Sequence, residues 1–395
     1  MAGKARITII SEPDQGGYND AQALGAQHQS IPGLASGLSL RRTFRACRDL
    51  ILFLKTRPAD LVWVHARLPV LLCRVAMMVR LWRPAHPVLF TFHGLPFGKG
   101  HRSVLGCLSG MVEHCILRFA PPLDLVFLSG EMKTRLITQV GAHIATRHRL
   151  HILPNCSDLD QQPPIGRKAG CNIVMTGRAC FQKDYATAVR VFASLPDRFT
   201  LTLAGSGTQV VGFQKRIARL VPHSTFNRIT FCGPVQEVGP LLLAADLFVM
   251  TSRYEGLPIG ALEAFEAGLP LILKDFDGAR ELAASHPFAL VAAFHDLASD
   301  QGQILALLAD YQRQLPRSRK AIKRAWAQSF SPEVFQRGVD QLLEDCGLPL
   351  IHSAAVPDYA HDGPAQHQYH DKTSGRPAPA LPPCYTDGAP SVRSE

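Results

Sequence analysis

The chain has 395 residues, of which 46% are hydrophobic and 19% are charged, and its formal net charge is +10. This length predicts two domains of ordinary size, and the composition is typical of a soluble globular protein. Because the sequence has no run of about 18 apolar residues and no signal peptide, we expect a cytosolic protein without a membrane span. The ten cysteines form no CxxC pair, which argues against disulfides and a zinc site.

The charge is concentrated in the first part of the chain, since residues 1–160 carry 19 Lys and Arg against 10 Asp and Glu. Such an excess favours an anionic partner, which could be nucleic acid, a phosphate-bearing substrate or a membrane surface. Solvated helix faces would produce the same excess, and both interpretations remain open.

Short apolar runs alternate with helical segments along most of the chain. They predict strands at 7–10, 60–66, 87–94, 124–129, 151–154, 172–177, 199–205, 229–233 and 246–251. Apolar strands separated by helices are typical of parallel sheets that are covered on both faces. The sequence therefore predicts an α/β fold.

Residues 41–55 form a predicted amphipathic helix between the first two of these strands. On a helical period Arg41, Arg45, Arg48 and Lys55 share one face, and Phe44, Cys47, Leu50, Ile51 and Leu54 share another. The basic face could rest on anionic lipid headgroups. A helix that covers a sheet and turns its basic face to water is the favoured alternative.

Two polar stretches mark boundaries. Residues 161–170, QQPPIGRKAG, separate two series of predicted strands and indicate a domain boundary. Residues 350–395 are rich in Pro, His, Ala and Gly, lack periodicity and predict a disordered tail.

The segment EGLPIGALE, residues 255–263, follows the predicted strand at 246–251. Pro258 suits the first turn of a helix, so Glu255 would precede the helix and Glu263 would lie about a turn and a half inside it. Free N–H groups at a helix N-terminus attract phosphate, and carboxylates accept hydrogen bonds from sugar hydroxyls. A nucleotide sugar has this layout, although an ordinary loop and an exposed helix position explain these nine residues equally well.

The segment resembles the E-x7-E signature of the retaining glycosyltransferases of family 4, the glycosyltransferase group 1 that includes bacterial polysaccharide-assembly enzymes. The resemblance extends over residues 60–345. It rests on four further segments in the order of the family, MTGRACFQKD (175–184), LAGSG (203–207), ITFCGPV (229–235) and AADLFVMTSRYEG (244–256).

The resemblance implies the glycosyltransferase B-type fold, in which two Rossmann-like domains face each other across a cleft. Residues 1–165 would then bind the acceptor and residues 169–325 the sugar nucleotide. Residues 329–346 would form a terminal helix that crosses back to the first domain.

The family's site residues carry over to matching positions of this chain. Arg178 and Lys183 would bind the diphosphate, Glu255 the hydroxyls of the transferred sugar, and Glu263 the ribose. His93, in a segment that resembles the family's T-x-H-G, would be a hydrogen-bond partner of the donor sugar. The other implied donor contacts are Gly16, Gly17, Gly177, Gly233, Val235, Gly256, Leu257, Pro258 and Gly278. Asp277 replaces a glycine of the family, which could change donor preference or merely be tolerated.

The implied function is the transfer of a hexosyl unit, with retention, from a UDP- or GDP-sugar to a hydroxyl of a glycan or lipid-linked acceptor in polysaccharide or glycolipid biosynthesis. No metal or other cofactor would be required, because Arg178, Lys183 and the helix N–H groups can stabilise the departing diphosphate. We expect a cytoplasmic protein, peripheral at the inner face of the cell membrane, with an anionic membrane surface as a further partner and no nucleic acid.

Two alternatives remain open from the sequence. The same fold could serve a nucleotide-sugar epimerase or phosphorylase. The chain could also be a catalytically dead transferase that acts as a nucleic-acid or membrane-binding module.

Overall fold

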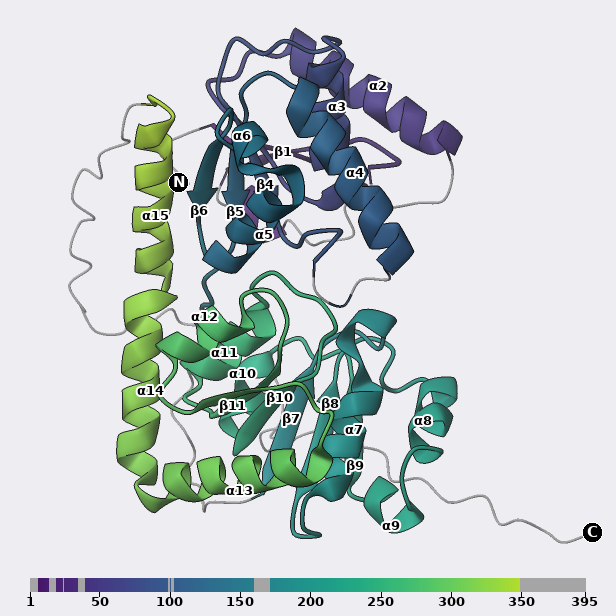
Figure 1. Cartoon of the computed structure of the whole chain (residues 1–395), viewed down its shortest axis with the longest axis vertical. Coiled ribbons are helices and arrows are strands. Elements are labelled where there is room, and N and C mark those ends of the chain that lie inside the picture. Colours follow the sequence, from purple (N-terminus) through teal and green to yellow (C-terminus); the bar gives the residue numbers. More distant parts are fainter. Residues whose placement is uncertain are drawn as a thin grey trace, which may run out of the picture.

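The computed structural model describes residues 6–13, 19–23, 25–34, 40–98, 100, 103–159 and 171–348. The predicted boundary at 161–170, the predicted tail at 350–395, and Gly16 and Gly17 lie outside these ranges. Two α/β units, which we call the N-terminal unit (6–159) and the C-terminal unit (171–329), are stacked along the long axis of the molecule (Figure 1). Both contain parallel sheets with helices, so the predicted α/β fold is confirmed.

The N-terminal unit is built on a four-stranded parallel sheet in the order β3-β4-β5-β6, which are Val62–Val64, Val88–Phe92, Asp124–Phe127 and Arg149–Ile152. Every residue of β4 and β5 is buried, as expected of strands covered on both faces. A separate two-stranded parallel sheet pairs β1 (Thr8–Ser11) with β2 (Gln27–Ser30). The helices of this unit are α1 (Asn19–Ala23), α2 (Leu40–Thr56), α3 (Arg67–Met78), α4 (Ser103–Phe119), α5 (Gly130–Val140) and α6 (Ala142–Ala145).

The C-terminal unit contains a six-stranded parallel sheet in the order β12-β11-β10-β7-β8-β9. In chain order these strands are Asn172–Thr176, Thr200–Ala204, Ile229–Gly233, Leu247–Met250, Leu271–Lys274 and Ala289–Ala292. The chain builds the sheet outward from β7 in one direction and from β10 in the other. The neighbours β7 and β10 therefore form the topological switch point, where open parallel sheets bind ligands at the carboxyl ends of their strands.

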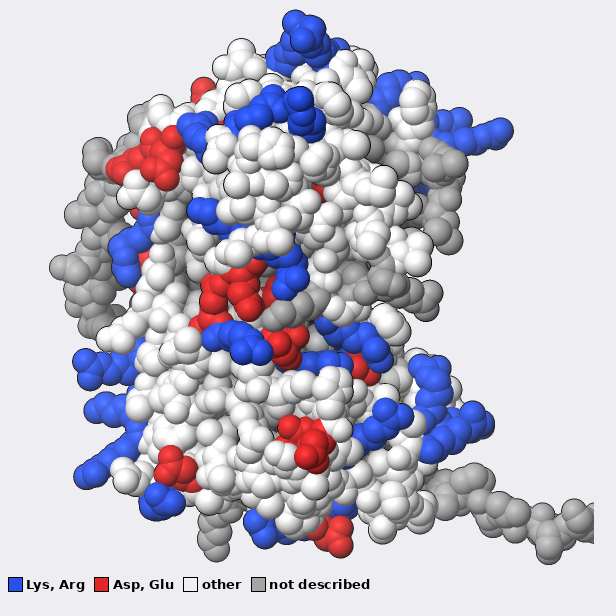
Figure 2. Space-filling view, in the orientation of Figure 1, with Lys and Arg blue, Asp and Glu red and all other residues white. Residues whose placement is uncertain are grey.

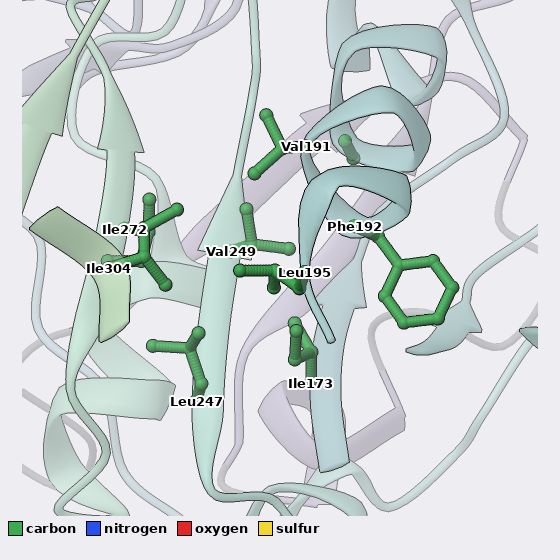
Figure 3. A pocket seen from close by; sticks show the side chains of 9 residues that line it. Ile173, Val191, Phe192, Leu195, Leu247, Val249, Ile272 and Ile304 are labelled. Carbon is green, nitrogen blue, oxygen red and sulfur yellow. The ribbon is translucent and has the colours of Figure 1, made fainter. Parts of the chain in front are cut away.

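The helical elements of this unit begin with the 3-10 turn η1 (Phe181–Lys183). They continue with α7 (Tyr185–Ser194), α8 (Val211–Ala218), α9 (His223–Phe226), α10 (Val238–Leu243), α11 (Ile259–Glu266), α12 (Ala279–Ser285), α13 (Leu297–Arg313) and α14 (Leu315–Ser329). A small apolar cavity lies among β7, β10, β11 and α7 (Figure 3). With a volume of ≈ 10 Å³ and a lining of Val, Ile, Leu, Ala and Phe, it is a packing gap of the core and offers no polar partner to a ligand.

The last described helix, α15 (Pro332–Asp345), returns to the N-terminal unit (Figure 1). Its Val339, Leu342 and Leu343 belong to one buried cluster with Leu89 and Val126 of the N-terminal sheet. The chain thus ties its two units together beyond their direct interface. Within the described ranges, none of the helices has both the length and the apolar character needed to cross a membrane.

Candidate functional site

The candidate site lies at the switch point of the C-terminal sheet. The loop after β7 contains Gly177, Arg178 and Lys183, and the loop after the neighbouring β10 leads to Glu255. Because parallel strands end at the same edge, these loops lie side by side although 72 residues separate Lys183 from Glu255. The tertiary structure thus brings together two predicted site segments.

Lys183 and Glu255 form an ion pair, with 2.7 Å between Nζ and Oε1. Their side chains are only 18% and 11% exposed, so the pair is shielded from water much more than a surface pair. In the sequence prediction the ammonium binds the diphosphate and the carboxylate binds the sugar. A diphosphate at this position would therefore compete with Glu255 for Lys183.

Asp184 anchors the loop that carries Lys183. Its carboxylate accepts hydrogen bonds from Arg253 at 2.8 Å and Lys274 at 2.9 Å, and the Thr251 hydroxyl donates to its backbone oxygen. Burial favours the protonated carboxyl, but the hydrogen bonds from Lys274 and Thr187 and the charges of Lys274 and Arg253 prevail and hold the pKa of Asp184 below its usual value. The carboxylate thus locks the loops after β7 and β10 together. No sequence motif assigned a role to Asp184, Arg253 or Lys274, because the three residues meet only in the folded chain.

The helix predicted from EGLPIGALE is α11, with Pro258 at its N-cap and Glu263 as its fifth residue. Glu263 is half-buried, and burial, with a smaller contribution from Glu266, raises the pKa of its carboxyl. A Cβ on Gly260 would lie 2.7 Å from Oγ1 of Thr176 and 3.9 Å from Oε2 of Glu263. Because Gly260 has no side chain, α11 can pack closely against Thr176 at the carboxyl end of β7, and the Glu263 carboxylate lies near that end.

Gly177 and Gly233, two of the predicted donor contacts, lie at the same edge of the sheet, at the carboxyl ends of β7 and β9. Gly205 has φ 138°, and a Cβ there would overlap the carbonyl oxygen of Gly177. Its N–H donates to the Gly233 carbonyl at 2.6 Å, so the loops after β7, β8 and β9 pack backbone to backbone. Val235 follows on the last of these loops and is 40% exposed, while Arg178 is exposed beside Gly177.

The loop before α11 also touches the N-terminal unit. A Cβ on Gly256 would lie 2.5 Å from the carbonyl oxygen of His93, which follows β4. Leu257 is buried, and its carbonyl accepts a hydrogen bond from Nδ2 of Asn155 at 2.8 Å. His93 and the Glu255 loop are thus brought together from the two units.

His65 is a candidate site residue that the sequence analysis missed. Its Nδ1 lies 3.2 Å from Nε2 of His93, and the two residues follow the neighbouring strands β3 and β4. Burial lowers the pKa of both imidazoles, that of His65 to about 4 with a further contribution from His93. Both rings are therefore neutral near pH 7, and one N–H is shared between them. Its position at the end of the predicted strand 60–66, like that of His93 in 87–94, was the signal available in the sequence.

At the interface of the units, the N-termini of α5 and α12 each donate hydrogen bonds to a carboxylate of the other unit. Glu281 of α12 accepts hydrogen bonds from the N–H groups of Gly130, at 2.9 Å, and Glu131 at the start of α5. In return, Glu131 accepts from the N–H of Gly278 at 2.6 Å. Figure 2 shows that carboxylates and cations gather where the units meet. Gly278 is therefore bonded to the opposite unit in this structure.

Asp277, the departure from the family pattern, forms an ion pair with Arg135 of α5. The distance between Nε and Oδ1 is 2.7 Å, and the side chains are 32% and 3% exposed. Because the carboxylate is buried and its cation comes from the other unit, the substitution adds a contact between the units.

We expect Arg135→Ala to lower the free energy of unfolding by about 1–3 kcal/mol, because the buried Asp277 carboxylate would lose its ion pair with Arg135. Chemical denaturation of the two proteins measures the difference. Arg313→Ala is the matched control, since the Arg313–Asp310 pair is 69% and 61% exposed and should contribute less than about 0.5 kcal/mol. Equal losses in both variants would show that the contact between units contributes no more than a surface pair.

Comparison with protein families gives a match to the model "Glycosyl transferases group 1" over residues 170–310. The GDP-mannose:cellobiosyl-diphosphopolyprenol alpha-mannosyltransferase of Xanthomonas oryzae pv. oryzae is 30% identical over 286 residues, which are 69% of this chain and 72% of that protein. EpsF of Bacillus subtilis is 33% identical over 144 residues, 33% of this chain. The chain spans only 37% of the length of EpsF.

Among solved structures, Anabaena Alr3699/HepE in complex with UDP and glucose superposes with a TM-score of 0.65 at 15% identity. The match covers 85% of this chain and 91% of HepE. Likeness at this identity concerns the fold, and it confirms the predicted B-type arrangement of two α/β units.

Proposed function

Since this chain belongs to the group 1 glycosyl transferases, we propose that it transfers a hexosyl unit from a UDP- or GDP-sugar to a hydroxyl of a glycan or lipid-linked acceptor, with retention of the anomeric configuration. The names of two similar proteins support the donor class, because one contains GDP-mannose and the other was solved with UDP and glucose. The acceptor of the Xanthomonas protein, a cellobiosyl-diphosphopolyprenol, supports a lipid-linked acceptor here.

The observation that carries the proposal is the Lys183–Glu255 pair at the switch point, opposite His93. Lys183, the proposed cation for the diphosphate, and Glu255, the proposed carboxylate for the sugar, lie 2.7 Å apart. The N-terminus of α11 lies three residues beyond Glu255 and offers N–H groups and a positive dipole end. Glu263, inside the same helix, would accept hydrogen bonds from the ribose.

In the proposed reaction the bond between the anomeric carbon and the diphosphate oxygen breaks as the acceptor oxygen bonds to the same face of that carbon. The acceptor proton passes to the departing phosphate oxygen. Lys183 and the exposed Arg178 stabilise the charge that develops on the diphosphate, the role that a metal plays in other transferases. The neutral His93 donates or accepts a hydrogen bond at the sugar and does not act as a base.

The test begins with a panel of UDP- and GDP-hexoses in a thermal-shift assay, because a bound donor raises the melting temperature. The donor that binds is then incubated with glycan and polyprenyl-diphosphate acceptors. We expect a product with the donor's anomeric configuration by NMR, in the presence of EDTA as in its absence. Interconversion of the intact sugar nucleotide would instead show an epimerase, and sugar phosphate formed from inorganic phosphate would show a phosphorylase. A panel without any shift would contradict the proposal.

We further propose that the protein works in the cytoplasm and attaches reversibly to the inner face of the cell membrane through α2. Arg41, Arg45 and Arg48 are exposed on this helix. Phe44, which the helical period placed among the covering apolar residues, is 75% exposed beside them, and Leu52 is 57% exposed. Basic and apolar side chains thus share the outer surface of α2, as they do on helices that rest on anionic bilayers.

Reversal of Arg41, Arg45 and Arg48 to Glu should release the protein from anionic liposomes, because each cation contributes roughly 1 kcal/mol near such a surface. Liposome flotation at low and physiological salt measures the attachment, which should weaken with salt. The control reverses Arg313, Arg317 and Lys320 on α13 and α14, and donor hydrolysis should survive in both variants. If the wild-type protein does not bind anionic liposomes at low salt, the proposed attachment to the membrane is wrong.

A further inference from the structure

A second group of cations lies at the end of the N-terminal unit that is farthest from the candidate site. The carboxyl ends of β4 and β5 face the C-terminal unit, as the contacts of His93 and Gly130 show. The amino ends of the strands therefore point away from it, together with the segments that enter β3 and β4 and the C-terminal ends of α2 and α3 (Figure 1). Lys and Arg side chains gather at this end of the molecule (Figure 2).

An open depression of ≈ 640 Å³ lies between these segments. We call it the basic groove, and its charged or titratable lining residues are Lys55, Arg57, Arg80, Arg83 and His86. Among the described residues no carboxylate lines it, and apolar side chains that include Leu54 and the buried Trp82 complete it. Its volume is within the range of about 300–1,000 Å³ that is usual for small-molecule sites.

The cations of the basic groove lack anionic partners in the part of the chain that the structure describes. None of its lysine and arginine side chains forms an ion pair there, whereas other exposed arginines do, for example Arg48 with Asp49 and Arg280 with Asp275. Four like charges around one concave surface repel one another and concentrate a positive potential within it. A multivalent anion would relieve that repulsion.

Helix dipoles explain only part of this charge. Lys55 lies in the last turn of α2 and Arg80 lies just beyond α3, where cations are favourable. Arg57 directly follows the last residue of α2, and its N–H donates to the Phe53 carbonyl, so it also lies at that helix end. Arg83 lies five residues beyond the last residue of α3. The groove therefore has a second cation at the end of α2 and a further cation away from both helix ends.

Arg80, which lines the basic groove, has an unusual backbone conformation. Its φ is 61°, in the left-handed region, where glycine is favoured and another residue costs about 1 kcal/mol or more. Its N–H donates to Met77 and that of Leu81 to Ala76, so the backbone alone closes the end of α3. Glycine would serve this turn better, yet the chain places there an arginine whose exposed side chain lines the groove.

We propose that the basic groove binds a phosphate-bearing anion, as a second site that is independent of the donor site and of the transfer reaction. The cations of the rim hold the phosphate oxygens, and the exposed side chain of Leu81, which also lines the groove, covers the organic part of a phosphate ester. Two sources offer this chemistry, a soluble phosphate compound and the headgroup of an anionic phospholipid.

The test compares Arg80→Ala/Arg83→Ala with Arg317→Ala/Lys320→Ala, which removes the same two charges from the exposed surface of α14. Calorimetric titration with inorganic pyrophosphate should give two sites in the wild-type protein and in the control. Lys183→Ala should weaken one of them, and Arg80→Ala/Arg83→Ala should weaken the other at least tenfold. The second arm is flotation on phosphatidylglycerol vesicles. If the headgroup is the ligand, the groove variant should float less than the wild-type protein, and the Arg317→Ala/Lys320→Ala control should float as well as the wild-type protein.

Arg80→Gly separates binding from folding. It removes a charge from the groove and relieves the left-handed backbone, so the melting temperature should stay or rise while binding falls. A loss in the pyrophosphate arm identifies a soluble phosphate compound, and a loss confined to the vesicle arm identifies the lipid headgroup. If both groove variants match the control in both arms, the basic groove is only a solvated surface and the inference is overturned.

Discussion

Replacement of Glu255 by Gln should lower turnover by about 10²- to 10³-fold, the scale for loss of one electrostatic contact to a transition state. The amide keeps the shape of the side chain but loses the charge that would orient the hydroxyls of the transferred sugar. Affinity for free UDP or GDP should not fall, because Glu255 does not contact the nucleotide in this assignment and Lys183 is freed from its 2.7 Å ion pair.

Steady-state kinetics and nucleotide titrations of the Glu255→Gln variant measure the two effects separately. Glu263→Ala is the contrasting variant, since the ribose is held in ground and transition states alike and its loss should weaken nucleotide binding itself. If the two variants have the same kinetics and affinities, the roles of the two carboxylates are wrongly assigned.

Replacement of Lys183 by Ala should weaken the binding of UDP or GDP by about 1.5–3 kcal/mol, the usual scale for a charge-assisted hydrogen bond. Uridine or guanosine, which lack the diphosphate, should bind with nearly unchanged affinity. The loss has two sources, since the diphosphate loses a cation and the Glu255 carboxylate, only 11% exposed, loses its partner beside an incoming anion.

Titration of the Lys183→Ala variant with diphosphate and nucleoside gives this difference. Lys215→Ala, on the exposed face of α8 in the same unit, removes an equal charge and should change neither affinity. The double variant with Glu255→Gln should recover part of the lost affinity, because the unpaired carboxylate is gone. Equal losses for nucleoside and nucleoside diphosphate would contradict the assignment of Lys183 to the diphosphate.

Local sequence patterns were sufficient to predict several strands and one helix of the site. Continuous apolar runs such as 87–94 and 124–129 predicted β4 and β5, because strands buried on both faces need apolar residues on each. Pro258 and the helix formers after it predicted α11. The strands β2, β11 and β12 were not predicted. The sequence of β2, QHQS, has no alternation of apolar and polar residues. The sequences of β11 and β12, LILK and ALVA, are short apolar runs whose periodicity does not distinguish a strand from a helix.

Which distant side chains meet depends on how the strands and the two units are arranged in space. Lys183 and Glu255 are 72 residues apart, His65 and His93 are 28 apart, and Arg135 and Asp277 come from different units. Their proximity follows from strand order, which places the carboxyl ends of β7 and β10 next to each other, and from the way the two units dock. The strand order cannot be predicted from a local sequence pattern. Strands pair through backbone N–H and C=O groups, which are the same in every sequence, so the neighbour of each strand depends on the packing of the whole sheet.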